Sequence, residues 1–465
     1  MPMHRAIWRG SAAALGLLWL GAVAWADAVA HPPSDALAAY VARPDPSYTW
    51  RVRSQGRVGR SSYVELIMSS QTWRDTLWQH QLYIIHPSTR DPASKHALLF
   101  ISGGKWKPEL EGPATEGRLP RNSEVFVELT EKLRAPVAIL RQVPYQPLFD
   151  GLTEDSLIAL TFDRFLETGD QEWPLLLPMV KSAVRAMDTV QAYALTEWGT
   201  EIESFTVTGA SKRGWTTWLT GAVDSRVAAI APMVIDVVNM AEQMQHARAS
   251  WGQPSDKIRP YTERHLHERL DSPGGRSLMQ IVDPYSYRQV LRQPKVIING
   301  TNDEYWPLDA LNLYWSVLEG EKRVLYVPNN GHGLKDYKRI VGSLVALHRH
   351  VAYGDPLPVL QWQFEEARDS IRLELRASPR PERAAAWIAR SPTRDFREAR
   401  WESTMLKRRH GRYSIEVERP RSGYVAVLGE GVFSGKRTVR SHFSTTVQIF
   451  DAEATAPAAT TSPVR

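Results

Sequence analysis

The sequence predicts an α/β protein with a doubly wound, mostly parallel sheet and a smaller β domain near its C-terminus. Short apolar segments typical of buried strands alternate with segments of helical period from about residue 63 to residue 351. After GDPLP at 354–358 the helical period disappears, and β segments follow one another with turn residues between them. A chain of 465 residues is also long for one compact core, which favours two domains.

The larger domain is expected over residues 35–353. Its strands are predicted from apolar, β-prone segments at 63–70, 80–87, 96–104, 136–144, 204–209, 227–236, 294–300 and 322–329. Its helices are predicted from amphipathic period and capping residues at 122–135, 174–198, 212–223, 306–318 and 334–351. Residues 31–60 are rich in Pro and Arg and are expected to lie over the surface.

Two insertions interrupt the alternation, at 145–173 and 239–291. Both leave the sheet at carboxyl ends of strands, where α/β proteins form ligand sites, so both are candidate lid or specificity segments. Residues 355–450 are expected to form a β-sandwich that packs on the larger domain and shapes its cleft. Residues 451–465, of low complexity, are expected to be a disordered tail.

The N-terminus has the pattern of a secretory signal. Basic residues precede an apolar run at 11–26, and two sites with small residues follow it, so cleavage is expected after residue 26 or as late as residue 30. A run of 16 residues is shorter than the ~20 needed to span a membrane, although an uncleaved anchor stays an alternative. The sequence therefore predicts an exported protein, periplasmic or secreted, with no stable membrane span after signal removal.

The composition limits the chemistry of the chain. It contains no cysteine, which excludes disulfides, thiolate catalysis and cysteine-ligated zinc. The formal net charge of +6 is mild and evenly spread, so nucleic acid is not an expected partner. Seventeen Trp and sixteen Tyr supply either packing or stacking platforms for a flat ligand.

Ser211 is the candidate nucleophile. It follows the strand FTVTG and precedes the helix that begins near Lys212, with the small residues Gly209 and Ala210 before it. A nucleophile on such a sharp turn needs small neighbours, because the strand and helix backbones crowd it. The pattern departs from G-x-S-x-G, since Gly214 stands one position late, and a serine that caps the helix is the alternative.

The candidate acid and base follow the next strands of the sheet. Asp303 ends the apolar strand VIING in the loop TNDEYW, where Glu304 is its local rival. His332 lies between two glycines after the last strand of the domain and is the candidate general base. The order Ser211, Asp303, His332 is the chain order of α/β-hydrolases, which predicts a serine hydrolase on an α/β-hydrolase fold.

The backbone after the strand at 96–104 is the candidate oxyanion hole. The N–H groups of Ser102, Gly103 and Gly104, together with that of Lys212, are expected to stabilise the developing oxyanion. No motif indicates a cofactor. His265 and His267 in RHLHE would point apart on a helix, so a metal site is not expected.

Four segments resemble one family. GASKRGWTTWL, IAPMVIDVVNM, EWPLLLPMVKSAVRAMD and NGTNDEYW closely resemble the PhoPQ-activated pathogenicity-related proteins of bacteria, and the resemblance spans roughly residues 35–450. It implies an exported α/β-hydrolase fold with a C-terminal β domain. It also implies that Ser211, Asp303 and His332 carry the family's triad, and it implies a link to envelope stress or virulence. It implies no substrate.

The substrate stays open between a peptide and a carboxylic ester. Lys212 or Arg213 would add charge to the oxyanion site, and a basic residue there also appears in glucuronoyl-esterase-like enzymes, unless both side chains face solvent or bind acids. Glu154 and Asp155 would grip a free amino terminus, as in dipeptidyl-peptidase-like enzymes, unless they cap the next helix. The aromatic candidates for the cleft, each also a candidate for core packing, are Trp106, Tyr145, Trp173, Trp215 and Tyr305.

Two other classes of function compete with the hydrolase. A binding or signalling protein on a hydrolase fold without turnover is compatible with the displaced Gly214. A carbohydrate-binding envelope protein that uses the β domain rests on the aromatic content alone. The oligomeric state is not predicted.

Overall fold

A computed structural model describes residues 33–91, 94–113, 119–120, 123–435 and 439–452 of the chain. The predicted signal segment at 1–26 lies outside these residues, as does most of the predicted tail at 451–465. Asp451, the first residue assigned to that tail, instead ends a strand.

The central element is a mixed sheet whose middle strands are parallel. Within the described residues its order is β1-β2-β3-β5-β4-β6-β7-β8-β9-β17-β16-β12-β13, and β18 also pairs with β16. Its first nine strands are β1 (Thr49–Val58), β2 (Ser61–Trp73), β3 (Thr76–His86), β4 (His96–Ile101), β5 (Val137–Leu140), β6 (Ser204–Ala210), β7 (Val227–Met233), β8 (Lys295–Gly300) and β9 (Lys322–Val327). Strands β5, β4, β6, β7, β8 and β9 run parallel, while β1, β2 and β3 pair antiparallel.

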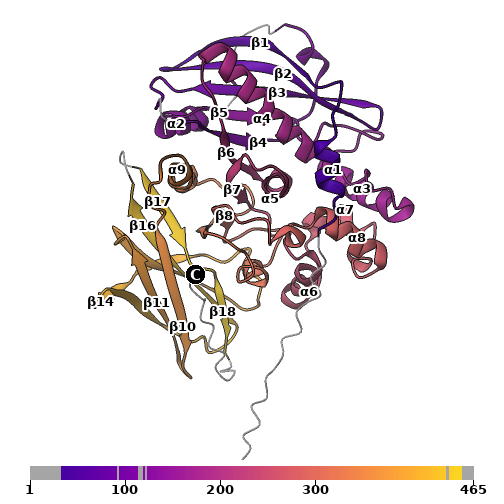
Figure 1. Cartoon of the computed structure of the whole chain (residues 1–465). Coiled ribbons are helices and arrows are strands. Elements are labelled where there is room, and N and C mark those ends of the chain that lie inside the picture. Colours follow the sequence, from indigo (N-terminus) through magenta and orange to yellow (C-terminus); the bar gives the residue numbers. More distant parts are fainter. Residues whose placement is uncertain (1–32, 92–93, 114–118, 121–122, 436–438, 453–465) are drawn as a thin grey trace, which may run out of the picture. The chain divides into compact units, whose positions relative to one another are not determined.

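Helices cover both faces of this sheet (Figure 1). One apolar core includes side chains from α4 (Leu176–Trp198) and α5 (Lys212–Val223). A second apolar core includes side chains from α2 (Glu124–Leu133) and α9 (Tyr337–Tyr353). The parallel strands are buried on both faces, which explains their continuous apolar sequences and confirms an α/β fold.

The strand order reverses at β4, which lies between β5 and β6. The chain thus leaves β4 toward one side of the sheet and later continues from β6 toward the other side. A reversal of this kind leaves a crevice at the carboxyl ends of the strands. The turns after β4, β6, β8 and β9 carry the candidate oxyanion site, nucleophile, acid and base, so one edge of the sheet collects all four.

The C-terminal strands form two sheets rather than a detached domain. The second sheet has the order β10-β11-β15-β14 and packs on β12, β16 and β18 through a shared apolar core. Strand β17 also pairs with β9 through Ser444 and Val324, so the first sheet continues into this part. The remaining bounds are β10 (Val359–Glu366), β11 (Ser370–Ser378), β12 (Arg383–Ser391), β13 (Glu402–Met405), β14 (Lys407–Arg409), β15 (Arg412–Glu418), β16 (Tyr424–Ser434), β17 (Arg440–Ser444) and β18 (Gln448–Asp451).

Two predictions on local structure are wrong. The segment 306–318 is not a helix, because only a short 3₁₀ turn, Ala310–Leu313, forms there. Its aromatic residues lie in a loop, and their side chains are buried. The Asn312 amide donates to the Val447 carbonyl at 2.8 Å. Residues 31–60 also carry more structure than expected, since α1 (Ala36–Ala42) packs against the core and β1 pairs with β2. The Arg-rich β1 is largely exposed, so its sequence lacks the apolar pattern from which a strand is predicted.

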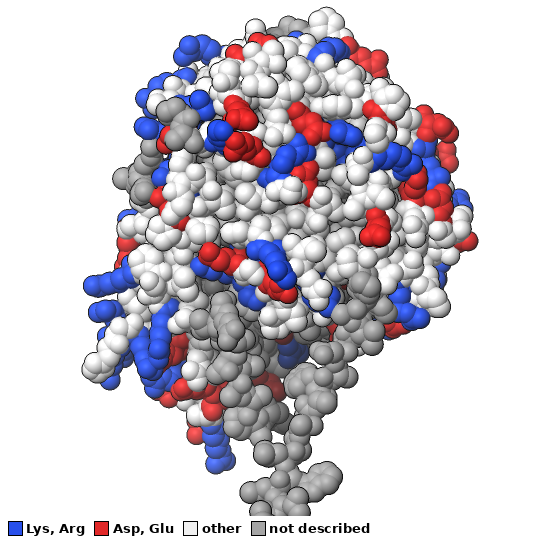
Figure 2. All heavy atoms as spheres, in the orientation of Figure 1, with Lys and Arg blue, Asp and Glu red and all other residues white. Residues whose placement is uncertain are grey.

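Helices α3 (Glu154–Thr168), α6 (Met240–Trp251), α7 (Arg259–Thr262) and α8 (Pro273–Val282) come from the two insertions. No helix in the described part of the chain combines the length and apolar character that a membrane crossing requires. On the face drawn in Figure 2, basic and acidic side chains are interspersed over most of the surface.

His96 makes the fold sensitive to acid. It begins β4, and its ring nitrogens lie 2.7 Å from Ser204 Oγ and 2.9 Å from Thr206 Oγ1, with the His348 ring 4.7 Å away between centroids. Burial lowers the pKa of His96 from 6.5 to about 4. A histidine with a lowered folded-state pKa stabilises the protein fully above pH ~6.5, and this contribution disappears as the pH falls toward 4.

The free energy of unfolding of the unmodified protein should fall between pH 7 and pH 4.5. We expect this fall to be smaller in His96→Gln. The difference from the unmodified protein should reach about 3 kcal/mol, because one pKa unit corresponds to ~1.4 kcal/mol. Denaturant unfolding at the two pH values measures it. His410→Gln is the matched control, since His410 is exposed. Equal pH dependence in all three proteins would contradict the assignment.

Candidate active site

Ser211 occupies a strained turn between β6 and α5. Its backbone has φ 58° and ψ −128°, a conformation that is costly for a residue with a Cβ. Its N–H donates to the Met233 carbonyl at 2.9 Å, which fixes the turn against β7. Its side chain makes no capping hydrogen bond to α5, so the structure does not support the helix-cap alternative. Strain of this kind at a half-buried turn between a strand and a helix is typical of a presented nucleophile.

The displaced glycine fits this turn. A Cβ on Gly209 would lie 2.8 Å from the Arg213 carbonyl oxygen, and a Cβ on Gly214 would lie 2.6 Å from Ile235 Cγ2. Both distances are too short for real side chains, so β6, α5 and β7 approach closely only with glycine at both positions. Gly214 therefore supports the close packing of the helix although it stands one residue later than in G-x-S-x-G.

Arg213 points away from the nucleophile. Its guanidinium binds Glu154 through two hydrogen bonds of 2.8 and 2.7 Å, and its Nε donates to the Val143 carbonyl at 2.5 Å. The guanidinium also lies where a Cβ on Gly103 would be, which explains the glycine there. Arg213 thus joins α5 to α3 and to the loop after β5, and it is not a donor for the oxyanion.

Lys212 and Asp155 form a second ion pair, and it lies at the mouth of the site. Lys212 Nζ is 2.8 Å from Asp155 Oδ2 and 3.3 Å from Glu154 Oε2. The Tyr261 hydroxyl donates to Asp155 Oδ1 at 3.0 Å. Burial raises the pKa of Glu154, but the hydrogen bonds and charge of Arg213 outweigh it and lower that pKa to about 2. Both carboxylates are therefore already neutralised by cations.

This pairing corrects the expectation for Glu154 and Asp155. A carboxylate already paired with a cation attracts the amino terminus of a peptide less strongly than an unpaired one. Here Glu154 does not line the pocket beside Ser211, and Asp155 is held by Lys212 and Tyr261. The sequence could not show this, because Asp155 and Lys212 are 57 positions apart.

His332 and Asp303 are hydrogen-bonded across two loops. Nδ1 of His332 lies 3.1 and 3.0 Å from the two carboxylate oxygens of Asp303. Since Nδ1–H donates to the carboxylate, Nε2 is left as the proton acceptor. Nε2 is buried and has no hydrogen-bond partner among the described residues, and His332 lines the same pocket as Ser211. The arrangement can accept a proton from a group bound there.

Glu304 holds the histidine loop rather than the imidazole. Its Oε2 accepts the backbone N–H of His332 at 3.0 Å. Asp303 also accepts the backbone N–H of Tyr305 at 2.9 Å, and the Tyr305 ring stacks on the His332 ring with centroids 4.0 Å apart. The geometry thus favours Asp303 over its rival as the partner of the imidazole.

Asp236 is a further acid that the sequence reasoning missed. It follows β7, is fully buried, and accepts hydrogen bonds from the Tyr314 hydroxyl at 2.5 Å and the Asn299 amide at 2.8 Å. Burial raises its pKa to about 6, and the negative charge of Asp303 contributes to the rise.

The oxyanion prediction is corrected at Ser102. Its N–H donates to the Leu140 carbonyl at 2.7 Å within the sheet, so that group is not available to a substrate. The carbonyls of Gly103 and Gly104 accept hydrogen bonds from Gln142 N–H and the Gln146 amide. Lys212 is the first residue of α5, where N–H groups have no intrahelical acceptor, and it lines the pocket.

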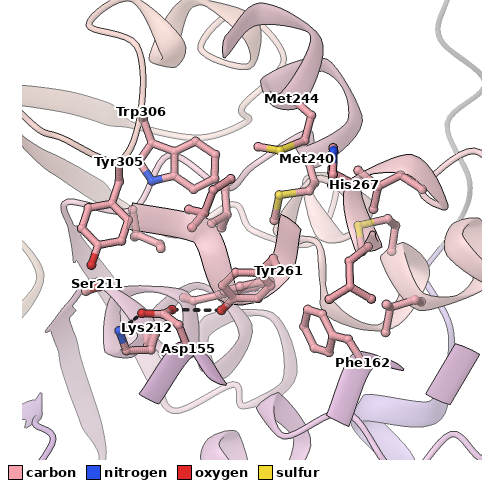
Figure 3. A pocket seen from close by; sticks show the side chains of 18 of the residues that line it. Asp155, Phe162, Ser211, Lys212, Met240, Met244, Tyr261, His267, Tyr305 and Trp306 are labelled. Carbon is pink, nitrogen blue, oxygen red and sulfur yellow. Dashed lines mark hydrogen bonds and ion pairs between the residues drawn. The ribbon is translucent and has the colours of Figure 1, made fainter. Parts of the chain in front are cut away.

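Ser211 and His332 line a narrow apolar pocket. Figure 3 shows this pocket with Ser211 toward one side. About 70 Å³ of its interior admits the centre of a water-sized sphere. The insertion at 145–173 contributes Phe162 and Leu166, and the insertion at 239–291 contributes most of the remaining wall, including Met240, Met244, Tyr261, Leu270 and Leu278. Both candidate specificity segments thus form the wall of the pocket.

The predicted aromatic residues divide into two groups. Trp215 and Tyr305 line the pocket. Trp106 and Tyr145 neighbour each other at 6.1 Å, and Trp173 packs on Trp73, so these three belong to the packing beyond the pocket. Trp306 and His267 line the pocket but were missed as ligand contacts.

His265 and His267 are not on an α-helix as the sequence analysis assumed. A short 3₁₀ turn, Leu266–Glu268, follows His265, which is exposed, whereas His267 faces the pocket. Among the described residues, no group of three or more His, Asp or Glu side chains is placed to hold a metal ion.

Comparison with known proteins decides the family. The family described as PhoPQ-activated pathogenicity-related protein matches residues 37–397. The chain belongs to this family. A relative from Dictyostelium discoideum, named autocrine proliferation repressor protein A, is 32% identical over 348 residues, which cover 71% of this chain and 68% of the relative.

Solved structures resemble this PhoPQ-related protein more distantly. An acetyl xylan esterase from Thermoanaerobacterium covers 67% of this chain and 92% of its own at 13% identity, with a TM-score of 0.45. A glucuronoyl esterase from Solibacter usitatus covers 68% of this chain and 91% of its own at 13% identity, with a TM-score of 0.39. Scores and identities this low do not establish a shared activity.

In this PhoPQ-related protein, the C-terminal part contacts the loops that carry Asp303 and His332 rather than the pocket. The Asn302 amide donates to the carbonyls of Phe396, Arg397 and Ala399 at 3.2, 3.0 and 2.7 Å. Asn329 exchanges two hydrogen bonds with the backbone of Trp401. Among the described residues, none after His332 lines the pocket, so the expectation that the β domain shapes the cleft is wrong for this pocket.

Proposed function

We propose that this chain is an exported serine hydrolase that acts through Ser211, His332 and Asp303 with a covalent acyl-enzyme. The observation that carries the proposal is the meeting of two features in one pocket. The strained Ser211 lines it, and so does His332, whose Nδ1 is bound by Asp303 and whose Nε2 has no partner among the described residues.

In the proposed mechanism, His332 first takes a proton and then returns it. Ser211 Oγ attacks the substrate carbonyl while His332 Nε2 takes the hydroxyl proton, and the same proton then passes to the leaving group. Asp303 holds the Nδ1–H tautomer and stabilises the imidazolium. The Lys212 N–H and the N-terminal end of α5 stabilise the oxyanion. Water then attacks the acyl-enzyme with His332 as base, which releases the acid and restores Ser211.

Within this class we favour a carboxylic ester over a peptide with a free amino terminus. The reason is electrostatic, because Glu154 and Asp155 are neutralised by Arg213 and Lys212. We expect the purified protein to hydrolyse p-nitrophenyl esters, and to do so faster than it hydrolyses aminoacyl p-nitroanilides. Higher activity on the anilides would overturn the preference for esters without affecting the triad.

Export is part of the proposal. It rests on the basic residues, apolar run and small-residue sites of the first 30 residues. Mass spectrometry of the protein expressed with its own N-terminus in a bacterial host tests it. The proposal expects a chain that begins near Asp27 or His31 outside the cytoplasm, and an intact chain retained in the cytoplasm would contradict it. We also propose a link to envelope stress or virulence, which is supported by the word pathogenicity in the family's description.

The second candidate is a binding or signalling protein without turnover. The name of the 32% identical relative, a repressor of proliferation, favours it. The two candidates differ in their response to Ser211→Ala, because a signalling role that needs only the surface of the fold survives this change. A biological effect that Ser211→Ala retains in full would favour signalling.

A further inference from the structure

The pocket beside Ser211 has a polar mouth and an apolar interior. Ser211, Lys212, Asp155 and Tyr305 lie toward one end of the view in Figure 3, and His267 lies at the other. Phe162, Met240 and Met244 lie between these ends. The ion pair of Lys212 with Asp155 satisfies the charges at the mouth, so the interior offers a ligand little besides apolar contact.

The far end of the pocket lies next to a second depression. Met244, His267 and Leu270 line the pocket and also line a separate polar depression bounded by Arg248, Glu268 and Asp271. His267 is mostly buried, and its Nδ1 has no hydrogen-bond partner among the described residues. The far end of the pocket therefore adjoins a polar depression of the surface.

We propose that this pocket binds the acyl part of the substrate, and that the acyl group is an apolar chain longer than acetyl. The inference rests on the proposed function. The inference goes beyond the proposed function because it names the substrate class, which is an ester of a medium-length aliphatic acid. The reason is that apolar walls favour an acyl chain by removing its methylene groups from water.

The narrowness of the pocket favours the acyl side of the substrate over the leaving group. After the first step the acyl group is covalently bound to Ser211, while the leaving group must diffuse away before water enters. A leaving group enclosed between Phe162, Met244 and Leu270 would be trapped behind the acyl-enzyme. An acyl chain in the same place is freed by hydrolysis of its bond to Ser211.

A series of p-nitrophenyl esters from acetate to decanoate tests the proposal on the full-length mature protein. We expect kcat/KM to rise about threefold for each added methylene until the pocket is full. The octanoate should therefore exceed the acetate by at least about 100-fold. A flat or falling series, with measurable hydrolysis of the acetate, would overturn the inference and leave the proposed function intact.

Variants locate the selectivity in this pocket. Met244→Trp fills the far end, so it should lower the ratio of octanoate to acetate kcat/KM at least tenfold. Phe162→Ala enlarges the pocket and should move the optimum of kcat/KM to longer acyl chains. This second variant tests the inference even if Met244→Trp does not fold. Leu195→Trp is the matched control on α4, because Leu195 is 61% exposed, and it should leave the ratio unchanged. Unchanged ratios in both pocket variants would overturn the inference.

A binding measurement separates failure of the inference from failure of the proposed function. Ligand-observed NMR of Ser211→Ala with ethyl octanoate and ethyl acetate needs no turnover. Binding of the octanoate alone, together with no hydrolysis by the unmodified protein, would retain the apolar pocket and refute the hydrolase. No preference for the octanoate in this experiment would refute the pocket assignment directly.

Discussion

Ser211→Ala and His332→Ala are each expected to lower kcat/KM for a p-nitrophenyl ester by a factor of ~10⁴ or more. In the proposed mechanism, Ser211 supplies the atom that attacks, and His332 supplies the nitrogen that takes its proton. Because the two residues act in one step, the double variant should be no slower than the slower single variant. Steady-state kinetics measure all three proteins, with circular dichroism to verify the fold.

Matched controls are available on the surface. Ser316 and His410 are exposed, and neither lines the pocket, so Ser316→Ala and His410→Ala should keep full activity. If Ser211→Ala retains full activity, the nucleophile assignment is wrong. Additive losses in the double variant would show that the two residues do not act as a unit.

Asp303→Asn is expected to lower kcat by a factor of ~10⁴, close to the effect of removing the base. The carboxylate holds the Nδ1–H tautomer of His332 through contacts of 3.0 and 3.1 Å. An amide at position 303 can donate to Nδ1, which reverses the tautomer and places the proton on Nε2. A protonated Nε2 cannot accept the proton of Ser211.

Glu304→Gln is the matched comparison at the neighbouring position. Glu304 accepts the backbone N–H of His332, and a glutamine carbonyl can accept the same hydrogen bond. We therefore expect a loss of less than about tenfold, which reflects a change of loop position rather than of protonation. Comparable losses in Asp303→Asn and Glu304→Gln would show that Asp303 does not act through the imidazole. The pH dependence of kcat measured on both variants separates these cases.

The order of the motifs along the chain predicted the positions of Ser211, Asp303 and His332 on the fold. Each residue follows an apolar strand, and parallel strands with short apolar sequences place their carboxyl ends at one edge of a sheet. The tight turn at Ser211 was also predictable from the sequence, because Gly209 and Ala210 are small enough for the strand and the helix to approach closely there. These signals are local in sequence, so they do not depend on which distant segments meet.

Contacts between distant segments were not predictable in the same way. The ion pairs of Lys212 and Arg213 with α3 join residues more than 50 positions apart, and the contacts of Asn302 with 396–399 span more than 90 positions. The helix predicted at 306–318 failed for a related reason. Its apolar spacing reflects side chains buried by tertiary packing, with only Ala310–Leu313 in a helical turn.

The contacts at 396–401 give the C-terminal part a role that the sequence did not indicate. Asn302 precedes the acid Asp303, and Asn329 lies in the loop that carries His332. Residues that fix these loops act on the alignment of the imidazole with its carboxylate, which matters because small displacements of catalytic groups lower rates strongly. The loop between β12 and β13 therefore supports the loops that carry Asp303 and His332 without lining the pocket.

Labelling with a fluorophosphonate probe tests the central claim most directly, because the probe reacts with an activated serine and needs no knowledge of the substrate. The purified mature protein is treated with the probe beside Ser211→Ala and His332→Ala, and the adduct is mapped by peptide mass spectrometry. The account predicts one adduct on Ser211 in the unmodified protein, none in Ser211→Ala and strongly slowed labelling in His332→Ala. A well-folded unmodified protein that takes no label, or takes it at another residue, would contradict the account.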